Sequence, residues 1–335
     1  MATAAMITAA AARLSGHAIR TPLLSSPFLD ELAGRRVFVK PECLQKTGSF
    51  KFRGGWSAVS ALAAKGALSN GVIAYSSGNH AQGVALAAQM HGVPAVIIMP
   101  GDAPAVKIAN TCALGAEVVL YDRVNEDRDA IGARLAAVRG LALIKPFDDP
   151  EVIAGQGTVG LEIAQDAAVL GVGQADVLVC CGGGGLTAGI ALALAENAPH
   201  LRPRPVEPVG FDDTARSLVS GQFERNAPDA QSLCDAILTP SPGQITLPIM
   251  RAHCGPGLVV SDHDCLRAMA LAWARLRIVV EPGGAVALAA ALFHGNQLRG
   301  DTVIAVASGG NVDAAIFAQA LNLAMTETAV ARSLG

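Results

Sequence analysis

The sequence predicts an α/β protein in which parallel sheets are flanked by helices. The first reason is an alternation of short apolar strands and helical segments, joined by short turns, over residues 71–139. A second series of the same kind follows Pro146. The composition agrees, because 51% hydrophobic residues with only 4% aromatics suit helices packed closely on a sheet. A chain of 335 residues can form one large or two medium domains around a sizeable core.

The first part of the chain is expected to be helical over residues 7–16, a loop at 20–23 and a strand at 36–40. From residue 54 the pattern is helical, through Trp56, Val59 and Leu62. The alternating region then predicts strands at 71–75, 95–99 and 117–121, and helices at 80–91, 103–114 and 126–139.

The second series predicts strands at 176–181, 204–210, 258–260 and 302–307, and helices at 152–170, 186–197, 262–276, 284–294 and 313–324. Residues 222–256 are rich in Pro, Ser and Asp, and we assign no regular structure to them.

Charge and hydropathy limit the classes of partner. The net charge is -3 with dispersed charges, so no polyanion-binding face is indicated and nucleic acid is not an expected partner. The longest charge-free apolar stretches, 186–195 and 283–293, are shorter than the ~20 residues that span a bilayer, and we interpret them as core helices. No basic segment precedes the apolar N-terminus, and the 7 cysteines show no metal-ligand spacing. A cytoplasmic protein with reduced thiols is expected.

Lys51 is the first candidate catalytic residue, because it follows Phe50 and precedes a predicted helix, near the N-terminus of that helix. Removal from water and the positive end of the helix dipole both favour a neutral amine over the ammonium form. A neutral amine is nucleophilic and can form a Schiff base. The alternative is an ordinary loop lysine in solvent.

Four consecutive glycines, 182–185, lie between a predicted strand and a predicted helix. Without Cβ atoms the backbone can turn sharply and direct several N–H groups into one concavity, which makes a phosphate cradle. The alternative is a flexible turn. The spacing fits neither a dinucleotide fingerprint nor a Walker motif. Ser308, with Gly309, Gly310 and Asn311 after it, ends another apolar strand, and that is a ligand position in open α/β sheets.

These segments together resemble the serine/threonine dehydratase and serine racemase family, whose members use pyridoxal 5'-phosphate (PLP) and have the two-domain tryptophan synthase β-like fold, fold type II. The matching segments, in the order of the family, are Ser49-Phe50-Lys51-Phe52-Arg53-Gly54, Ser76-Ser77-Gly78-Asn79-His80, the four glycines and Ser308-Gly309-Gly310-Asn311. The resemblance implies a large domain of residues 1–69 and 148–335, a small mobile domain of residues 70–147, and a homodimer.

The resemblance also implies roles for individual residues. Lys51 would hold the cofactor and act as general base, and Ser77 would handle a proton on the opposite face. The other cofactor contacts implied are Phe50, Asn79, Gly182, Gly183, Gly184, Gly185, Leu186, Glu281 and Ser308. The substrate contacts implied are Ser76, Ser77, Asn79, His80 and Arg128, the last of which could hold a second carboxylate. N-capping is the alternative for Ser76, Ser77 and Asn79, and a solvated helix charge is the alternative for Arg128.

A divalent-cation site is implied at the segment from Glu207 to Asp213, where both carboxylates and the carbonyl of Phe211 form an oxygen set suited to Mg²⁺ or Ca²⁺. The alternative is capping of the following helix by Asp212 or Asp213.

The expected reaction is PLP-dependent α,β-elimination of water from a β-hydroxy L-amino acid such as L-threonine or L-serine, which yields a 2-oxo acid and ammonia. The alternatives are a 3-hydroxyaspartate or phenylserine dehydratase, a serine racemase with side elimination activity, and a non-enzymatic sensor. Cys234-Asp235-Ala236-Ile237 departs from the family pattern on the substrate side, so a substrate other than serine or threonine stays open. The length leads us to expect no C-terminal regulatory domain.

Overall fold

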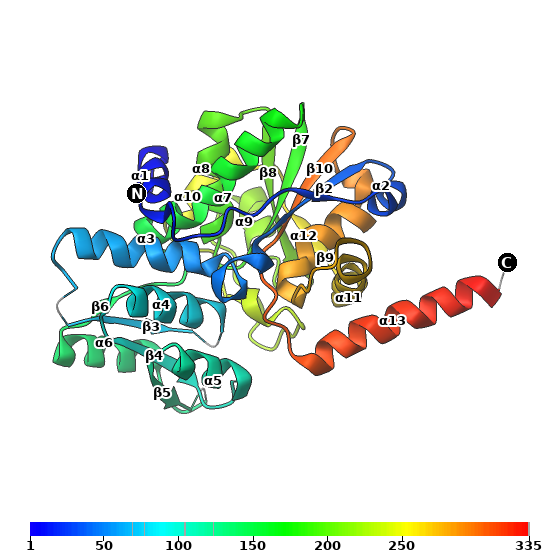
Figure 1. Ribbon diagram of the computed structural model, residues 1–335. Coiled ribbons are helices and arrows are strands. Elements are labelled where there is room, and N and C mark those ends of the chain that lie inside the picture. The colour runs from blue at the N-terminus through cyan, green and yellow to red at the C-terminus, as the bar shows by residue number, and fades with distance from the viewer. Residues whose placement is uncertain (69, 77, 104, 123, 334–335) are drawn as a thin grey trace.

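The computed structural model describes residues 1–68, 70–76, 78–103, 105–122 and 124–333, and it has the predicted α/β architecture (Figure 1). One sheet has six strands in the order β1-β2-β10-β7-β8-β9, and the other has four in the order β5-β4-β3-β6. Every pair of neighbouring strands in these sheets is parallel except β1 with β2. The strands are β1 (Leu24–Ser25), β2 (Arg36–Pro41), β3 (Val72–Tyr75), β4 (Ala95–Pro100), β5 (Glu117–Tyr121), β6 (Ala142–Leu143), β7 (Ala175–Cys180), β8 (Leu201–Pro208), β9 (Leu258–Val260) and β10 (Thr302–Ala307).

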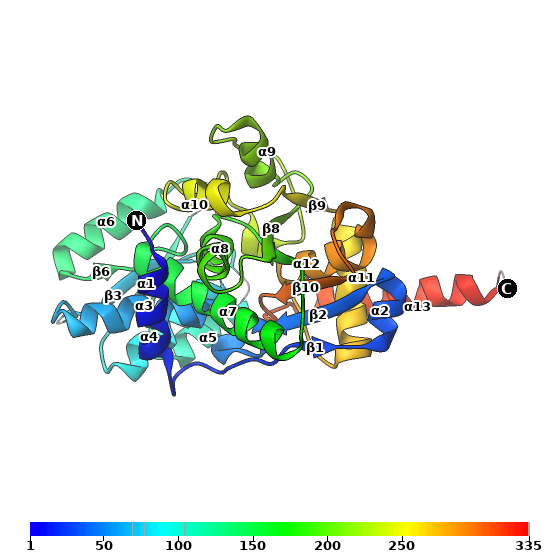
Figure 2. The same cartoon turned by 90° about the horizontal axis from the view of Figure 1, so that it is seen from above.

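Helices cover both sheets, and α13 extends away from the rest of the molecule in both views (Figures 1 and 2). The α-helices are α1 (Ala4–Leu14), α2 (Pro27–Ala33), α3 (Lys51–Ala64), α4 (Asn79–Met90), α5 (Ala105–Ala113), α6 (Arg128–Arg139), α7 (Pro150–Val169), α8 (Gly185–Asn197), α9 (Asp213–Ser220), α10 (Thr246–His253), α11 (Asp262–Leu271), α12 (Pro282–Phe293) and α13 (Ala314–Ser333). The described part of the chain contains no helix long and apolar enough to cross a membrane.

The sequence prediction missed the strands β1 and β6 and the helices α2 and α10. The short strands β1 and β6 and the helix α2 carry too few residues to show a period. Helix α10 lies in the segment left without structure. Its Pro248 sits in the first helical turn, where proline is tolerated because its missing N–H would have no intrahelical partner. The helix expected over residues 262–276 stops being α-helical at Leu271 and ends in one π-helical turn over Ala272–Leu276.

The carboxyl ends of the four central strands, β2, β10, β7 and β8, meet at one edge of the six-stranded sheet. Ala307 of β10 pairs with Pro41 of β2, and Cys180 of β7 pairs with Val206 of β8. The segments that follow these strands therefore emerge side by side, which brings Ser308 and the glycine run to the same edge.

Helix α3 lies between the two sheets and packs against α4 on one side and α7 on the other (Figure 1). Both contacts are close. A Cβ atom at Gly155 of α7 would lie 2.3 Å from the carbonyl oxygen of Arg53, and one at Gly83 of α4 would lie 2.8 Å from the carbonyl carbon of Lys51. The start of α3 is thus held by direct backbone contact with its neighbours.

The buried guanidinium of Arg53 fixes the same end of α3. It bonds both carboxylate oxygens of Glu42 at 2.8 Å and those of Glu162 at 2.7 and 3.0 Å. Thr158 of α7 and the carbonyl of Ile19 take further bonds at 3.2 and 3.1 Å. These charges raise the pKa of the guanidinium despite the opposing effect of burial, so it stays protonated. The network joins the N-terminal segment, α3 and α7.

We expect Gly155→Ala to lower the free energy of unfolding by about 2 kcal/mol, because the added methyl group overlaps the backbone of α3. Gly173→Ala is the matched control, since a Cβ atom there meets nothing within 4 Å. The measurement is urea denaturation of both variants. Equal stability of the two would contradict the role given to the α3–α7 contact.

Candidate active site

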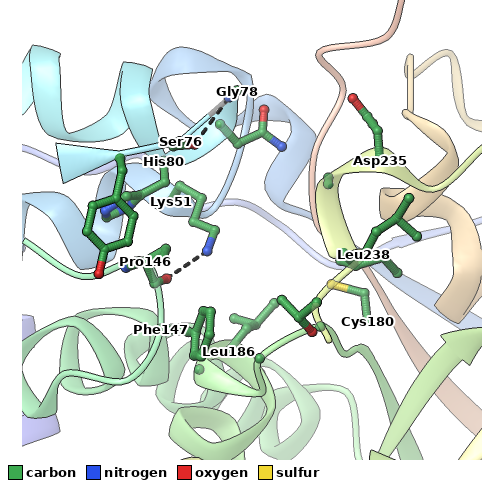
Figure 3. Close-up of a pocket in the computed structure, with 18 of the residues that line it drawn as sticks. Lys51, Ser76, Gly78, His80, Pro146, Phe147, Cys180, Leu186, Asp235 and Leu238 are labelled. Carbon is green, nitrogen blue, oxygen red and sulfur yellow. Dashed lines mark hydrogen bonds between the residues drawn. The ribbon is translucent and has the colours of Figure 1, made fainter. Parts of the chain in front are cut away.

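A cavity of about 520 Å³ lies where loops from the two sheets face each other (Figure 3). It contains most of the residues singled out from the sequence. The described lining residues are Phe50, Lys51, Tyr75, Ser76, Gly78, Asn79, His80, Asp102, Ala103, Lys107, Arg128, Pro146, Phe147, Gln156, Cys180 and residues 182–186 and 235–240. Ser77 lies outside the described residues.

Lys51 is the first residue of α3, and its amine points into this cavity (Figure 3). The Nζ atom donates a hydrogen bond of 2.7 Å to the carbonyl of Pro146 and lies 5.1 Å from the centre of the Phe50 ring. Removal from water lowers the pKa of Lys51 to about 8, although Cys180 and Glu281 act in the opposite direction. About one amine in ten is therefore neutral at pH 7.

The four glycines form the turn from β7 into α8. Gly184 has φ of +87°, which glycine adopts without strain, and a Cβ atom at Gly183 would lie 2.3 Å from the ring of Phe147. The carbonyl of Gly183 accepts bonds from Thr246 Oγ1 at 2.6 Å and from the Gly243 amide at 3.2 Å.

The amide groups of this turn are available to a ligand. Within the described part of the chain, the N–H groups of Gly183, Gly184, Gly185 and Leu186 donate no hydrogen bond. They lie at the N-terminus of α8, where the helix dipole favours negative charge. The turn therefore has the composition of an anion site, as the glycine run predicted.

The turn from β3 to α4 brings Ser76 and Asn79 to the cavity. Ser76 Oγ accepts from the Gly78 amide at 3.1 Å, and the N-cap residue of α4 is Gly78, with no side-chain cap bond. Asn79 begins the helix, donates to Glu281 Oε1 at 2.5 Å and accepts from Asn311 Nδ2 at 2.7 Å. For Ser76 and Asn79, the structure thus shows turn and bridging contacts in place of helix capping.

His80 is buried and neutral. Its Nε2 atom lies 3.0 Å from the carbonyl of Ile144, an acceptor, so we assign the proton to Nε2. Burial, together with the charge of Lys51, lowers the pKa of His80 to about 3. Nδ1 is buried without a partner and has a lone pair. The ring cannot offer a carboxylate either a charge or a second donor at neutral pH.

Glu281 and Ser308 lie close to this group, but neither is among the described residues that line the cavity. Burial, and next the charge of Asp235, raise the pKa of Glu281 to about 7, and its Oε2 atom has no hydrogen-bond partner. Ser308 is 4% exposed, and its carbonyl accepts from the Phe50 amide at 3.1 Å. That bond joins the end of β10 to the residue before Lys51.

Two cationic side chains on helices of the smaller sheet line the cavity. Arg128 is exposed at the start of α6, and its Cζ atom lies 5.2 Å from the centre of the Tyr75 ring. Lys107 of α5 is buried and bonds Asp235 across the cavity at 2.6 Å. Sequence reasoning missed Tyr75, Lys107 and Phe147. No local pattern marks Lys107, since its partner is 128 residues away.

The segment proposed for a cation lies apart from this cavity. Both oxygens of Glu207 accept backbone N–H groups of α9, from Thr214 at 3.0 Å and Ala215 at 2.7 Å. Glu207, and not Asp212 or Asp213, therefore caps this helix. Burial raises the pKa of Glu207 well above its usual range and that of Asp213 to about 6, and Asp213 Oδ2 has no partner. Among the described residues, no three His, Cys, Asp or Glu side chains form a metal-binding group.

Comparison with known proteins identifies the family. The family model described as "Pyridoxal-phosphate dependent enzyme" matches residues 14–309. An L-threo-3-hydroxyaspartate ammonia-lyase of Pseudomonas sp is 43% identical over 93% of this chain and 96% of its own. The solved structure of a threonine deaminase from T.th. is 45% identical, covers 93% of this chain and 99% of its own, and has a TM-score of 0.87. Maize serine racemase is 34% identical over 98% and 99%, with a TM-score of 0.88.

The cavity residues fit pyridoxal phosphate. An amine with a lowered pKa faces the cavity, and the glycine turn offers unbonded amides to a phosphate group. The volume of about 520 Å³ is sufficient for a ligand of this size. The resemblance found in the sequence, including its cofactor, is thus confirmed.

Lys51 should make the cofactor-free protein less stable at neutral pH. The folded state binds the Lys51 proton more weakly than the unfolded chain, because the pKa falls from 10.5 to about 8. The resulting loss in the free energy of unfolding is fully present below pH 8 and disappears as the pH rises to about 10.5. We expect Lys51→Met to raise the free energy of unfolding at pH 7 by up to about 3 kcal/mol, and by less at pH 9.5.

Urea denaturation at the two pH values measures this difference. Lys65→Met, at an exposed position, is the control and should change stability by less than about 0.5 kcal/mol. A pH-independent effect of Lys51→Met would show that the amine is not desolvated.

Proposed function

Since the chain belongs to the family of pyridoxal-phosphate dependent enzymes, we propose that it is an ammonia-lyase that eliminates water from a β-hydroxy L-amino acid and releases a 2-oxo acid and ammonia. The observation that carries the proposal is the Lys51 amine, with a pKa of about 8, in the cavity that the glycine turn also lines. An amine with a pKa near the working pH can both accept and return a proton.

We propose L-threo-3-hydroxyaspartate as the first candidate substrate. A curated relative with this activity covers nearly the whole chain, and Arg128 lines the cavity as a cation for a second carboxylate. L-Threonine or L-serine is the second candidate, favoured by the likeness to a threonine deaminase. Phenylserine elimination and serine racemisation remain outcomes of the assay below.

The chain's own residues would divide the work as follows. Ser76, Asn79 and the N-terminal amides of α4 would bind the substrate α-carboxylate, and the amides of the glycine turn would hold the cofactor phosphate. Ser308 would face the pyridine nitrogen, and a hydroxyl there does not hold that nitrogen protonated as a carboxylate would. When bound, pyridoxal phosphate supplies the electron sink that makes the Cα proton removable.

Lys51 Nζ would remove that Cα proton. The hydrogen bond from this amine to the carbonyl of Pro146 holds it at the cavity. The β-hydroxyl leaves as water only with a proton, and the ammonium group just formed at Nζ can donate it. Phe147 packs against the glycine turn on this side and would limit the access of bulk water.

Lys51→Ala should abolish turnover and the visible absorbance of the bound cofactor at about 410 nm, because both need the amine. The assay is 2-oxo acid formation from L-serine, L-threonine, L-threo-3-hydroxyaspartate and L-threo-3-phenylserine, with chiral analysis of the remaining substrate. Lys65→Ala, which removes an exposed lysine, is the control. An unchanged spectrum of Lys51→Ala would overturn the assignment of this residue.

We also propose a divalent cation, Mg²⁺ or Ca²⁺, at Glu207, Asp213 and the carbonyl of Phe211. Two buried carboxylates with raised pKa values, one with an unpartnered oxygen, support it. The cation would be structural, since these residues do not line the cavity.

At about one hundred times its Kd, Ca²⁺ should stabilise the wild type by about 3 kcal/mol and leave Asp213→Asn unaffected. The effect should weaken as the pH falls through about 6, where protons compete for Asp213. Asp212→Asn is the matched control. Thermal unfolding measures the shift, and equal shifts in both variants would refute this site.

The remaining proposals concern the whole molecule. We propose that residues 70–147, which contain the four-stranded sheet, form a small mobile domain against the rest. We also propose that the protein is a homodimer and that it is located in the cytoplasm. Light scattering tests the homodimer, and cell fractionation tests the location.

A further inference from the structure

We propose that Tyr75 is a specificity-determining residue: its ring holds the Arg128 guanidinium in position, and so favours substrates with a second carboxylate. The inference rests on the proposed function and extends it to a residue that does not itself take part in the chemistry. The observation behind it is the stacking of the two side chains at 5.2 Å, within the range of a cation–π contact.

The ring of Tyr75 is itself held in place. Tyr75 is the last residue of β3 and packs on a buried cluster of side chains from the small sheet. The cluster comprises Ile73, Val96, Ile98, Tyr121 and Leu141. A ring anchored in this way gives an exposed arginine a fixed surface.

Helix α6 packs against the ring of Tyr75. Arg128 and Gly132 are four residues apart and therefore lie on the same face of the helix. A Cβ atom at Gly132 would lie 3.5 Å from the Tyr75 ring and 3.3 Å from Ile98. Gly132 thus lies in van der Waals distance of the ring, and the guanidinium of Arg128 covers the ring on the same side of the helix.

The stacking uses only the face of the guanidinium. A cation–π contact uses the face of the guanidinium, whereas a carboxylate bonds the N–H groups in its plane. Because an exposed arginine has many rotamers, fixing it before the substrate arrives reduces the entropy lost on binding.

The position of Tyr75 also fixes the distance between the two groups proposed to bind the substrate carboxylates. The residue after it, Ser76, begins the turn proposed for the α-carboxylate, so one strand end places both binding groups. The Ser76 amide is fixed by a bond of 3.1 Å to the carbonyl of Ile98. A rigid separation of two carboxylate sites selects dicarboxylates of matching length.

The test compares kcat/KM for L-threo-3-hydroxyaspartate and L-serine in Tyr75→Leu, Tyr75→Phe, Arg128→Met and the double variant Tyr75→Leu/Arg128→Met. We expect Tyr75→Leu to lower the ratio about tenfold, mainly through KM for the dicarboxylate, because the arginine loses its fixed position. Tyr75→Phe retains the ring face and should stay within about twofold of the wild type. In the double variant, Tyr75→Leu should add nothing to Arg128→Met.

Two further measurements separate a specific effect from general damage. Phe28→Leu removes the ring beneath Arg275, an equivalent stack at 4.2 Å outside the cavity, and should leave the ratio unchanged. Calorimetric binding of succinate and butyrate to the holoenzyme should show weaker succinate binding in Tyr75→Leu and equal butyrate binding.

Equal losses for both substrates in a stably folded Tyr75→Leu would overturn the inference, as would full additivity with Arg128→Met or a Tyr75→Phe as impaired as Tyr75→Leu. If the wild type converts neither substrate, the proposed function fails instead. The comparison of succinate with butyrate still decides the role of Tyr75 in that case.

Discussion

The arrangement of this molecule depends on the buried guanidinium of Arg53. It sits two residues after Lys51 and bonds Glu42, Glu162 and Thr158, so it ties the start of α3 to segments before and after it in the chain. Leaving one of these charges buried without its partner would cost about 3–5 kcal/mol, so the group holds one arrangement. The close backbone contacts at Gly83 and Gly155 restrict the same helix end. The position of the Lys51 amine follows from this restraint.

In the cavity and directly beside it, burial pushes ionisable groups toward their neutral forms. The pKa of Lys51 falls to about 8, that of His80 falls to about 3, and that of Glu281 rises to about 7. Each shift has desolvation as its largest cause. Such a set disfavours the folded state, and its presence at one place is typical of a functional site. Neutral groups there can exchange protons at a pH where ordinary lysine and glutamate side chains stay charged.

Binding selectivity and catalysis draw on different parts of the fold. The amine, the glycine turn and Ser308 belong to segments before and after the strands of the large sheet, whereas Arg128, Tyr75 and Lys107 belong to the segments around the small sheet. The Lys107–Asp235 ion pair joins the two sides across the cavity. Substitutions around the small sheet can therefore change which substrate side chains the cavity accepts, without changing the position of the Lys51 amine.

The sequence alone determined the features that rest on local pattern: the α/β class, a helix shortly after Lys51, the glycine turn into α8, and Ser308 at a strand end. Hydrophobic periodicity, glycine runs and helix termini depend on residues that are neighbours in the chain, so the amino-acid sequence is sufficient to predict them. The tertiary structure alone decided what distant segments do to one another. The Lys51 amine donates to the carbonyl of Pro146, 95 residues away. Glu207 caps α9, a role that the sequence had suggested as an alternative for Asp212 or Asp213, and Arg128 stacks on Tyr75. Such contacts follow from packing and desolvation in three dimensions, and no spacing along the chain encodes them.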